Sequence, residues 1–173
     1  MEQILAKAKQ IRLVIFDIDG VLTDGRLFFD DSGHEYKAFH ARYGHGIKML
    51  RNSGVEVAII SGRHCESVPR RMACLGVNHV YQGQEDKVVA FNELCNKLPV
   101  NPMQVAHVGD DLPDLPIMQR VGMAIAVADA HFAVLERADW CTNLCGGQGA
   151  AREVCDLIMQ AQETLDMAIN TYL

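Results

Sequence analysis

Short runs of apolar residues recur along the chain, and polar or turn-forming positions bound each of them. An apolar run rich in β-branched residues is typical of a strand that is buried on both faces of a parallel sheet. Three runs of this kind and two shorter ones predict strands at 11–16, 55–60, 104–108, 78–81 and 123–127.

Apolar residues at helical spacing fill the intervals between these runs. Ile47, Met49 and Leu50 fit a helix that ends near Gly54, because glycine commonly ends a helix. Two further stripes contain Val88, Phe91, Cys95 and Leu98 and, near the C-terminus, Val154, Leu157, Ile158, Ala161, Leu165, Ala168 and Ile169. Strands that alternate with helices predict an α/β fold with a doubly wound, mainly parallel, Rossmann-like sheet.

One interval departs from this alternation. Residues 26–29 and 35–39 flank four turn-forming residues at 30–33, which predicts a β-hairpin inserted at about 25–40. An ordinary loop is the alternative. No repeat, low-complexity tract or linker interrupts the chain, so we expect residues 1–173 to form a single domain.

Composition and charge exclude several classes of function. A net charge of −6 argues against binding to nucleic acid or to an anionic membrane surface, because both attract basic proteins. The N-terminus lacks a secretory signal pattern, and no run approaches the roughly 18 apolar residues of a membrane span. The six cysteines lack zinc-site spacing, so we expect reduced thiols in a cytoplasmic protein.

Charged and polar residues follow three of the predicted strands. They are Asp17, Asp19 and Gly20 after 11–16, Ser61, Gly62 and Arg63 after 55–60, and Asp110 and Asp111 after 104–108. Lys87 begins the helix after 78–81. Since ligands bind outside the carboxyl ends of the strands in an open parallel sheet, we expect these side chains to share one site.

Asp17 and Asp19 fit the chemistry of phosphoryl transfer. They are two positions apart, so they lie on one face, and Gly20 lets the backbone turn around a shared site. One carboxylate can attack phosphorus to form an aspartyl phosphate. The other can protonate the leaving alkoxide and then deprotonate the attacking water. A capped turn is the alternative for this Asp-x-Asp-Gly pattern.

The balance of charge indicates a metal ion. Asp17, Asp110 and Asp111 are negative when ionised, and a phosphate monoester adds about two further negative charges. One Mg²⁺ together with Lys87 balances the three carboxylates, and Mg²⁺ prefers oxygen ligands and substrate phosphates.

Three polar residues near this site have open roles. Lys87 at a helix start is unfavourable without an anionic partner, although a solvated lysine is the alternative. Ser61 either caps a helix or binds phosphate at a helix N-terminus. Asp114 either caps the following helix or orients Lys87.

The segments FDIDGVLTDG, SGR, Lys87 and GDDLPDL, in this order, resemble the four motifs of the haloacid dehalogenase superfamily. The resemblance implies that Asp17 is the nucleophile, that Asp19 is the acid and base, and that Lys87 belongs to the catalytic set. It also implies Mg²⁺ held by Asp17, the backbone carbonyl of Asp19, and Asp110.

Further segments narrow the resemblance to the family of 3-deoxy-D-manno-octulosonate 8-phosphate phosphatases, over about residues 10–165. They are DGRLFF, GHEYKAFHARYGHGI, AIISGR, LGVNHVYQGQEDK, VAHVGDDLPDLPIM, AIAVADAH and GGQGAAREVCDLI. This resemblance implies a phosphorylated sugar acid as substrate, in lipopolysaccharide sugar biosynthesis, and no cap domain. It also implies a homotetramer in which hairpins meet and neighbouring subunits close each site.

The same resemblance implies a set of substrate contacts. They are Asp19, His40, Ala41, Arg42, Tyr43, Gly44, Lys48, Ser61, Gly62, Arg63, Arg71 and Lys87, and Arg152 matches the arginine of the family's GGxGxxRE motif. Several cations fit a substrate with a carboxylate besides its phosphate. The family commonly has the sequence Arg-Asp-Gly-x-Gly in this loop, and the chain departs from it with Tyr43 in place of the aspartate.

Three other functions are alternatives. A phosphatase of a nine-carbon sugar acid 9-phosphate is close in sequence and stays open. A receiver-type signalling domain also phosphorylates an aspartate, but there the acidic pair precedes the nucleophile, whereas here it follows Lys87. A catalytically silent structural subunit fits poorly with intact Asp17, Asp19 and Asp110.

Overall fold

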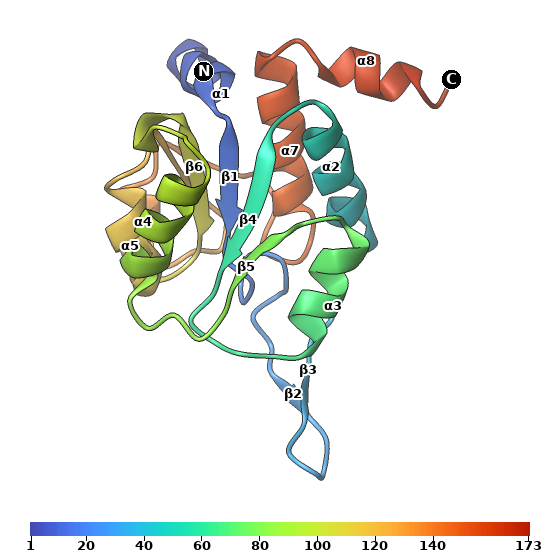
Figure 1. Cartoon of the computed structure of the whole chain (residues 1–173), viewed down its shortest axis with the longest axis vertical. Coiled ribbons are helices and arrows are strands. Elements are labelled where there is room, and N and C mark those ends of the chain that lie inside the picture. Colours follow the sequence, from blue (N-terminus) through green and yellow to red (C-terminus); the bar gives the residue numbers. More distant parts are fainter.

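The centre of the molecule is a six-stranded parallel sheet with the strand order β5-β4-β1-β6-β7-β8 (Figure 1). This is a computed structural model, and it describes all of residues 1–173. The strands are β1 Leu13–Phe16, β4 Glu56–Ile60, β5 His79–Tyr81, β6 Val105–Gly109, β7 Met123–Ala126 and β8 Trp140–Cys141. Because every neighbouring pair is parallel, all six strands end at one edge of the sheet.

Helices cover both faces of the sheet. The helices are α1 Glu2–Gln10, α2 Ala41–Asn52, α3 Ser67–Cys74, α4 Lys87–Lys97, α5 Leu115–Met118, α6 Phe132–Leu135, α7 Ala150–Ala161 and α8 Leu165–Asn170, with 3₁₀ turns η1 Pro102–Gln104 and η2 Leu112–Asp114. The apolar stripes of α2, α3 and α7 pack on one face, and α4 and α5 cover the other.

The alternation of side chains along β1 joins these two layers. Leu13 and Ile15 pack in the smaller apolar cluster with Phe91 of α4, whereas Val14 and Phe16 pack in the larger cluster beneath α2 and α7. Burial on both faces explains why this strand appears in the sequence as a continuous apolar run. The predicted doubly wound parallel sheet is therefore confirmed.

The order of the strands places a crevice beside β1. The chain runs outward from β1 to β4 and β5, and then returns to the other side of β1 at β6. Ligands in doubly wound sheets bind at such a switch point, outside the carboxyl ends of the strands.

The predicted hairpin is present, with shorter strands than expected. β2 covers Phe28–Phe29 and β3 covers Glu35–Tyr36, and the two pair in antiparallel register. The rings of Phe28 and Tyr36 stack with their centroids 5.6 Å apart. Figure 1 shows the hairpin projecting from the body beyond the carboxyl ends of β1 and β4.

All five predicted sheet strands are present, and their ends differ from the prediction by at most two residues. The sixth strand, β8, was not predicted. The C-terminal apolar stripe divides into α7 and α8, because the backbone turns at Glu163, which has a positive φ of 61°. The side chain of Gln162 donates to the backbone carbonyls of Ala8 and Ile11 at this turn. None of the helices has the length and apolar character needed to cross a membrane.

Candidate active site

A pocket of about 240 Å³ opens at the carboxyl ends of β1, β4 and β6. Its lining contains only polar residues, glycine and one proline. The lining residues are Asp17, Asp19, Gly20, Gly25, Ser61, Gly62, Arg63, Lys87, Asp110, Asp111, Pro113 and Asp114. The structure therefore brings together the residues that follow three separate strands, as the sequence predicted.

Lys87 joins two carboxylates at the base of the pocket. Its side chain is 3% exposed, and its Nζ lies 2.9 Å from Asp17 Oδ2 and 2.7 Å from Asp114 Oδ1. Burial lowers the pKa of Lys87, but the two carboxylates more than offset this and hold the pKa above its usual value. Lys87 is thus a charged group with two anionic partners, not a solvated surface lysine.

Asp114 supports this arrangement and has no free oxygen. Besides Lys87, its Oδ1 accepts from Nε2 of the fully buried His107, at 3.0 Å. Its Oδ2 accepts from the backbone N–H groups of Asp110 and Asp111. Although burial opposes ionisation, these donors hold the pKa of Asp114 well below its usual range. The question left open by the sequence is resolved: Asp114 orients Lys87, and it also fixes the turn after β6.

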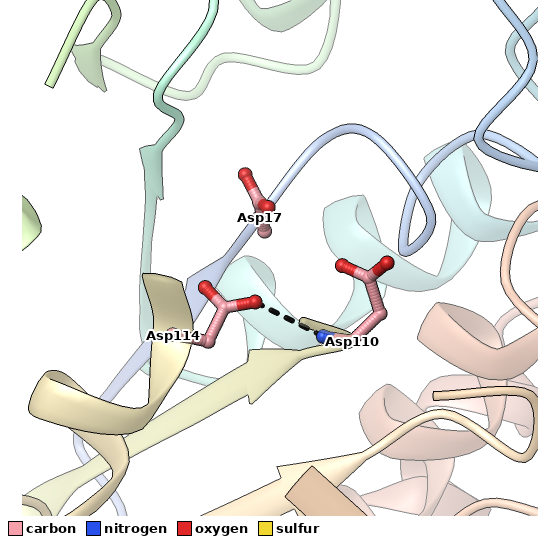
Figure 2. A group of neighbouring side chains, drawn as sticks. All are labelled: Asp17, Asp110 and Asp114. Carbon is pink, nitrogen blue, oxygen red and sulfur yellow. Dashed lines mark hydrogen bonds between the residues drawn. The ribbon is translucent and has the colours of Figure 1, made fainter. Parts of the chain in front are cut away.

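Asp17 and Asp110 have the free oxygens that a metal ion requires. One oxygen from each of Asp17, Asp110 and Asp114 lies within 4.8 Å of the other two (Figure 2). Asp17 Oδ1 is buried and has no hydrogen-bond partner. Burial and the neighbouring carboxylates Asp114 and Asp17 raise the pKa of Asp110 to about 8. A divalent cation bound by Asp17 and Asp110 would give the unpaired Oδ1 of Asp17 a partner. It would also offset the repulsion between the neighbouring carboxylates.

Gly20 makes the close approach of these loops possible. Its backbone has a positive φ of 82°, which only glycine adopts without strain. A Cβ at this position would also overlap the carboxylate of Asp110. The turn after Asp19 is therefore packed directly against a proposed metal ligand.

Asp111 lies outside this group of carboxylates. Its Oδ1 accepts from the backbone N–H of Leu112 at 2.8 Å and caps η2, and the residue is exposed. The charge balance predicted from the sequence counted Asp111, whereas the structure groups Asp114 with Asp17 and Asp110 instead.

Two hairpin residues, Lys37 and Glu35, contact side chains that line the pocket and were missed by the sequence analysis. Lys37 Nζ lies 2.5 Å from Asp19 Oδ1 and 2.7 Å from Glu35 Oε1. Glu35 Oε2 in turn accepts from Arg63 Nη2 at 2.6 Å. The only signal in the sequence was the alternation of charged and aromatic residues at 35–37, but no rule ties it to Asp19.

Ser61 is buried at the end of β4, and its backbone pairs with the carbonyl of Tyr81. Ser61 does not lie at a helix N-terminus, so the predicted helix cap is wrong, whereas phosphate binding by its hydroxyl stays a prediction. The next helix, α3, begins only at Ser67, with Glu66 at its N-cap. Ser61 and Gly62 instead present a hydroxyl and a turn of backbone to the pocket.

Seven of the expected substrate contacts do not line the pocket of their own chain. They are His40, Ala41, Arg42, Tyr43, Gly44, Lys48 and Arg71. His40 is the N-cap of α2, and its Nδ1 accepts from the backbone N–H of Arg42. Residues 41–44 form the first turn of that helix, in which Arg42 is exposed. Lys48 is exposed further along α2.

Tyr43 is a core residue, which explains how the chain tolerates its departure from the family pattern. Its ring is 1% exposed and packs edge-on against Phe39. The guanidinium of Arg71 lies over the ring, 5.6 Å from its centroid. Arg71 also fills the space beside Gly44, where a Cβ would overlap it. Within one chain, Arg71 therefore supports α2 and does not face the pocket.

Comparison with known proteins agrees with this geometry. A family model described as haloacid dehalogenase-like hydrolase matches residues 76–152. The 3-deoxy-D-manno-octulosonate 8-phosphate phosphatase of Escherichia coli K12 is 52% identical over 165 residues, which cover 95% of this chain and 88% of that protein. The chain belongs to the haloacid dehalogenase-like hydrolases.

Solved structures are also similar to this chain. The crystal structure of the phosphatase of the same name from Yersinia pestis superposes with a TM-score of 0.94 at 48% identity, covering 95% of this chain and 89% of that one. The Moraxella catarrhalis enzyme of that name, in complex with magnesium ion, phosphate ion and the sugar acid, gives a TM-score of 0.97 at 41% identity, covering 100% and 99% of the two chains. The family resemblance predicted from the motifs is confirmed.

The first prediction concerns metal binding by Asp110. Mg²⁺ should raise the melting temperature of the wild type, since a ligand that binds only the folded state stabilises it. Asp110→Asn should lose most of this shift, because an amide does not supply the negative charge that the cation requires. Differential scanning calorimetry with and without Mg²⁺ measures the effect. Asp111→Asn is the matched control and should keep the shift, so an equal loss in both variants would contradict the assignment.

The second prediction concerns Tyr43. Its buried hydroxyl has no hydrogen-bond partner, so Tyr43→Phe should leave stability near pH 7 unchanged or raise it by about 1 kcal/mol. Burial raises the pKa of Tyr43 to about 12, more than the nearby Arg71 lowers it. The wild type therefore loses stability as the pH rises from about 10 through about 12, and the variant should be spared this loss.

Urea unfolding near pH 7 and near pH 11 tests this expectation. Tyr172→Phe, at an exposed phenol, serves as the control and should behave as the wild type at both values. A Tyr43→Phe variant that is clearly less stable near pH 7 would show that the hydroxyl has a favourable partner.

Proposed function

We propose that this chain, acting as a single phosphatase domain, hydrolyses 3-deoxy-D-manno-octulosonate 8-phosphate to the free sugar acid and phosphate. The observation that carries the proposal is the convergence of Asp17, Asp19 and Asp110 on one pocket, with Lys87 beneath them. The substrate class is supported by the 52% identity to the Escherichia coli phosphatase of that name.

Asp17 is the proposed nucleophile. Its Oδ2 is held by Lys87, while its buried Oδ1 is free of hydrogen bonds and available for attack or for metal binding. Burial raises the pKa of Asp17 to about 6, and Lys87 opposes this rise, so the carboxylate is predominantly ionised at neutral pH. As a bond from Asp17 to phosphorus forms, the bond from phosphorus to the sugar oxygen breaks.

Asp19 is the proposed acid and base. Its Oδ2 is buried without a hydrogen-bond partner and can carry the proton that the leaving alkoxide takes up. The same oxygen then accepts a proton from the water that attacks phosphorus, which releases phosphate and regenerates Asp17. Ser61 and Lys87 lie in the same pocket and are placed to hold the phosphoryl oxygens.

Asp17, Asp110 and the backbone carbonyl of Asp19 are the proposed ligands of Mg²⁺. When bound there, the ion supplies positive charge that offsets the repulsion between the nucleophile and the substrate phosphate. The similar Moraxella catarrhalis enzyme binds a magnesium ion together with phosphate and the sugar acid, which supports this choice of ion.

The third prediction tests the nucleophile. Asp17→Asn should lower turnover by at least roughly 10³-fold, because it removes the carboxylate that is proposed to form the acyl phosphate. Phosphate release from the eight-carbon substrate, measured with Mg²⁺, gives the rate. Near-normal turnover in the purified variant would rule out the mechanism.

The same assay, run on the wild type, distinguishes the substrates. We expect a higher kcat/KM for the eight-carbon 8-phosphate than for a nine-carbon sugar acid 9-phosphate. The reverse order would keep the phosphatase mechanism and reassign the substrate.

A homotetramer is the assembly that we propose, with the hairpins at its centre. Leu27, Phe29 and Tyr36 are each 45–54% exposed on the hairpin, where an isolated pair of short strands is only marginally stable. Contact between hairpins would bury these side chains. It would also allow residues such as Arg42 and Lys48 of one subunit, which do not line their own pocket, to approach the pocket of a neighbour.

The fourth prediction tests the assembly. Phe29→Asp should dissociate the oligomer, because it places a charge at an apolar contact. Sedimentation velocity measures the change, and kcat/KM for the sugar phosphate should fall with it. Phe132→Asp is the control, since Phe132 is also exposed but lies on α6, away from the hairpin. A wild type that is monomeric and fully active would show that the site closes without a neighbour.

A reducing compartment, the cytoplasm, is also proposed. All six cysteines are free thiols in the structure, including the buried Cys65 and Cys155. Burial holds the pKa of Cys155 far above its usual value, which keeps that thiol protonated and unreactive.

A further inference from the structure

Lys37 is an unusual residue for a projecting hairpin. It directly follows β3, yet its side chain is only 1% exposed. Lysine is almost never buried unless its ammonium is paired, because desolvation of an unpaired charge is costly. The pairs here are Asp19 at 2.5 Å and Glu35 at 2.7 Å. Although burial lowers the pKa of Lys37, these two hydrogen bonds raise it above its usual value.

The contact with Lys37 makes the two oxygens of Asp19 different. Oδ1 accepts from Lys37, whereas Oδ2 is buried and has no hydrogen-bond partner. Arg63 Nε lies 3.9 Å from Oδ2, which is beyond hydrogen-bond distance. The terminal torsion of an aspartate is broad and roughly two-fold, so a carboxylate without such a contact has no fixed orientation.

Glu35 holds Lys37 in place from the other side. Its Oε1 accepts from Lys37, and its Oε2 accepts from Arg63 Nη2 at 2.6 Å. Although burial alone would raise it, these two donors keep the pKa of Glu35 below its usual value. A row of alternating charges therefore runs from Asp19 through Lys37 and Glu35 to Arg63, and it connects the turn after β1 with the turn after β4.

We propose that Lys37 is a positioning residue for Asp19, a role that rests on the phosphatase function proposed above. By binding Oδ1, Lys37 directs the free Oδ2 at the bridging oxygen of the substrate. When Asp17 bonds to phosphorus and the bridging bond breaks, the proton moves from Asp19 Oδ2 to the leaving alkoxide. Lys37 itself touches neither the substrate nor the phosphoryl group.

The dependence of the rate on the leaving group separates this role from a merely structural one. A sugar alkoxide needs a proton as it leaves, whereas a p-nitrophenolate is stable enough to leave without one. The ratio kcat/KM reports only the steps up to the loss of the leaving group, so it is independent of the later hydrolysis of the aspartyl phosphate. Loss of a general acid typically costs roughly 10²- to 10⁴-fold.

The fifth prediction follows. Lys37→Met should lower kcat/KM for the eight-carbon sugar phosphate by roughly 10²-fold or more, and by less than about tenfold for p-nitrophenyl phosphate. Lys37→Gln, which keeps an N–H donor without the charge, should show the same split with a smaller loss. Lys37→Arg should restore most of the activity on the sugar phosphate. If Lys37→Met does not fold, the Gln and Arg variants carry the comparison.

Lys7→Met is the matched control, because Lys7 also pairs with an aspartate at 2.5 Å, at Asp139 near the amino end of β7. Lys7→Met should leave kcat/KM unchanged from the wild type for both the sugar phosphate and p-nitrophenyl phosphate. An equal loss on both substrates in the Lys37 variants, or no loss on either, would overturn the positioning role. A wild type that hydrolyses neither substrate with Mg²⁺ would instead overturn the proposed function, so the two failures are distinguishable.

Discussion

The pairing of Lys87 with Asp17 and Asp114 is the interaction on which the rest of the site depends. Carboxylates that follow different strands meet at one sheet edge, and their repulsion in a partly buried site is severe. Lys87 binds Asp17 Oδ2 and Asp114 Oδ1, and Asp114 Oδ2 also accepts from the backbone N–H of Asp110. One buried cation thereby fixes the positions of two loops, and it leaves a negative excess that a divalent ion can balance.

The sheet explains why this pairing is possible. β1 lies between β4 and β6, so the residues that follow these three strands converge without any long connection. Gly20 adds the last requirement, because no larger residue fits between the turn after Asp19 and the carboxylate of Asp110. Backbone geometry therefore brings the functional residues to one site, and the hydrogen bonds of Asp114 then fix the orientation of their side chains.

The parts of the fold that depend on local pattern could be predicted from the sequence. The central strands appear as apolar runs because they are buried on both faces, and the carboxyl-end rule then placed Asp17, Ser61 and Asp110 together. Side-chain contacts between residues far apart in the sequence could not be predicted. Nothing local shows that Tyr43 turns into the core and takes Arg71 with it, or that Asp114 replaces Asp111 among the clustered carboxylates. Similarly, the two-residue strand β8 is too short to give a periodic signal.

Side chains that alternate from Glu35 to Lys37 give the hairpin two different sides. Glu35 and Lys37 pair with Arg63 and Asp19 and have side chains that are 13% and 1% exposed, whereas Tyr36 between them is 53% exposed. Since the side-chain period of a strand is two, a slip of one residue would exchange the two sides. Tyr36 would then face Asp19 and Arg63, and the charges of Glu35 and Lys37 would face outward. The proposed contact between hairpins would bury Phe29 and Tyr36, and it would therefore also stabilise the register that presents Lys37 to Asp19 in a hairpin whose ladder has only two residue pairs.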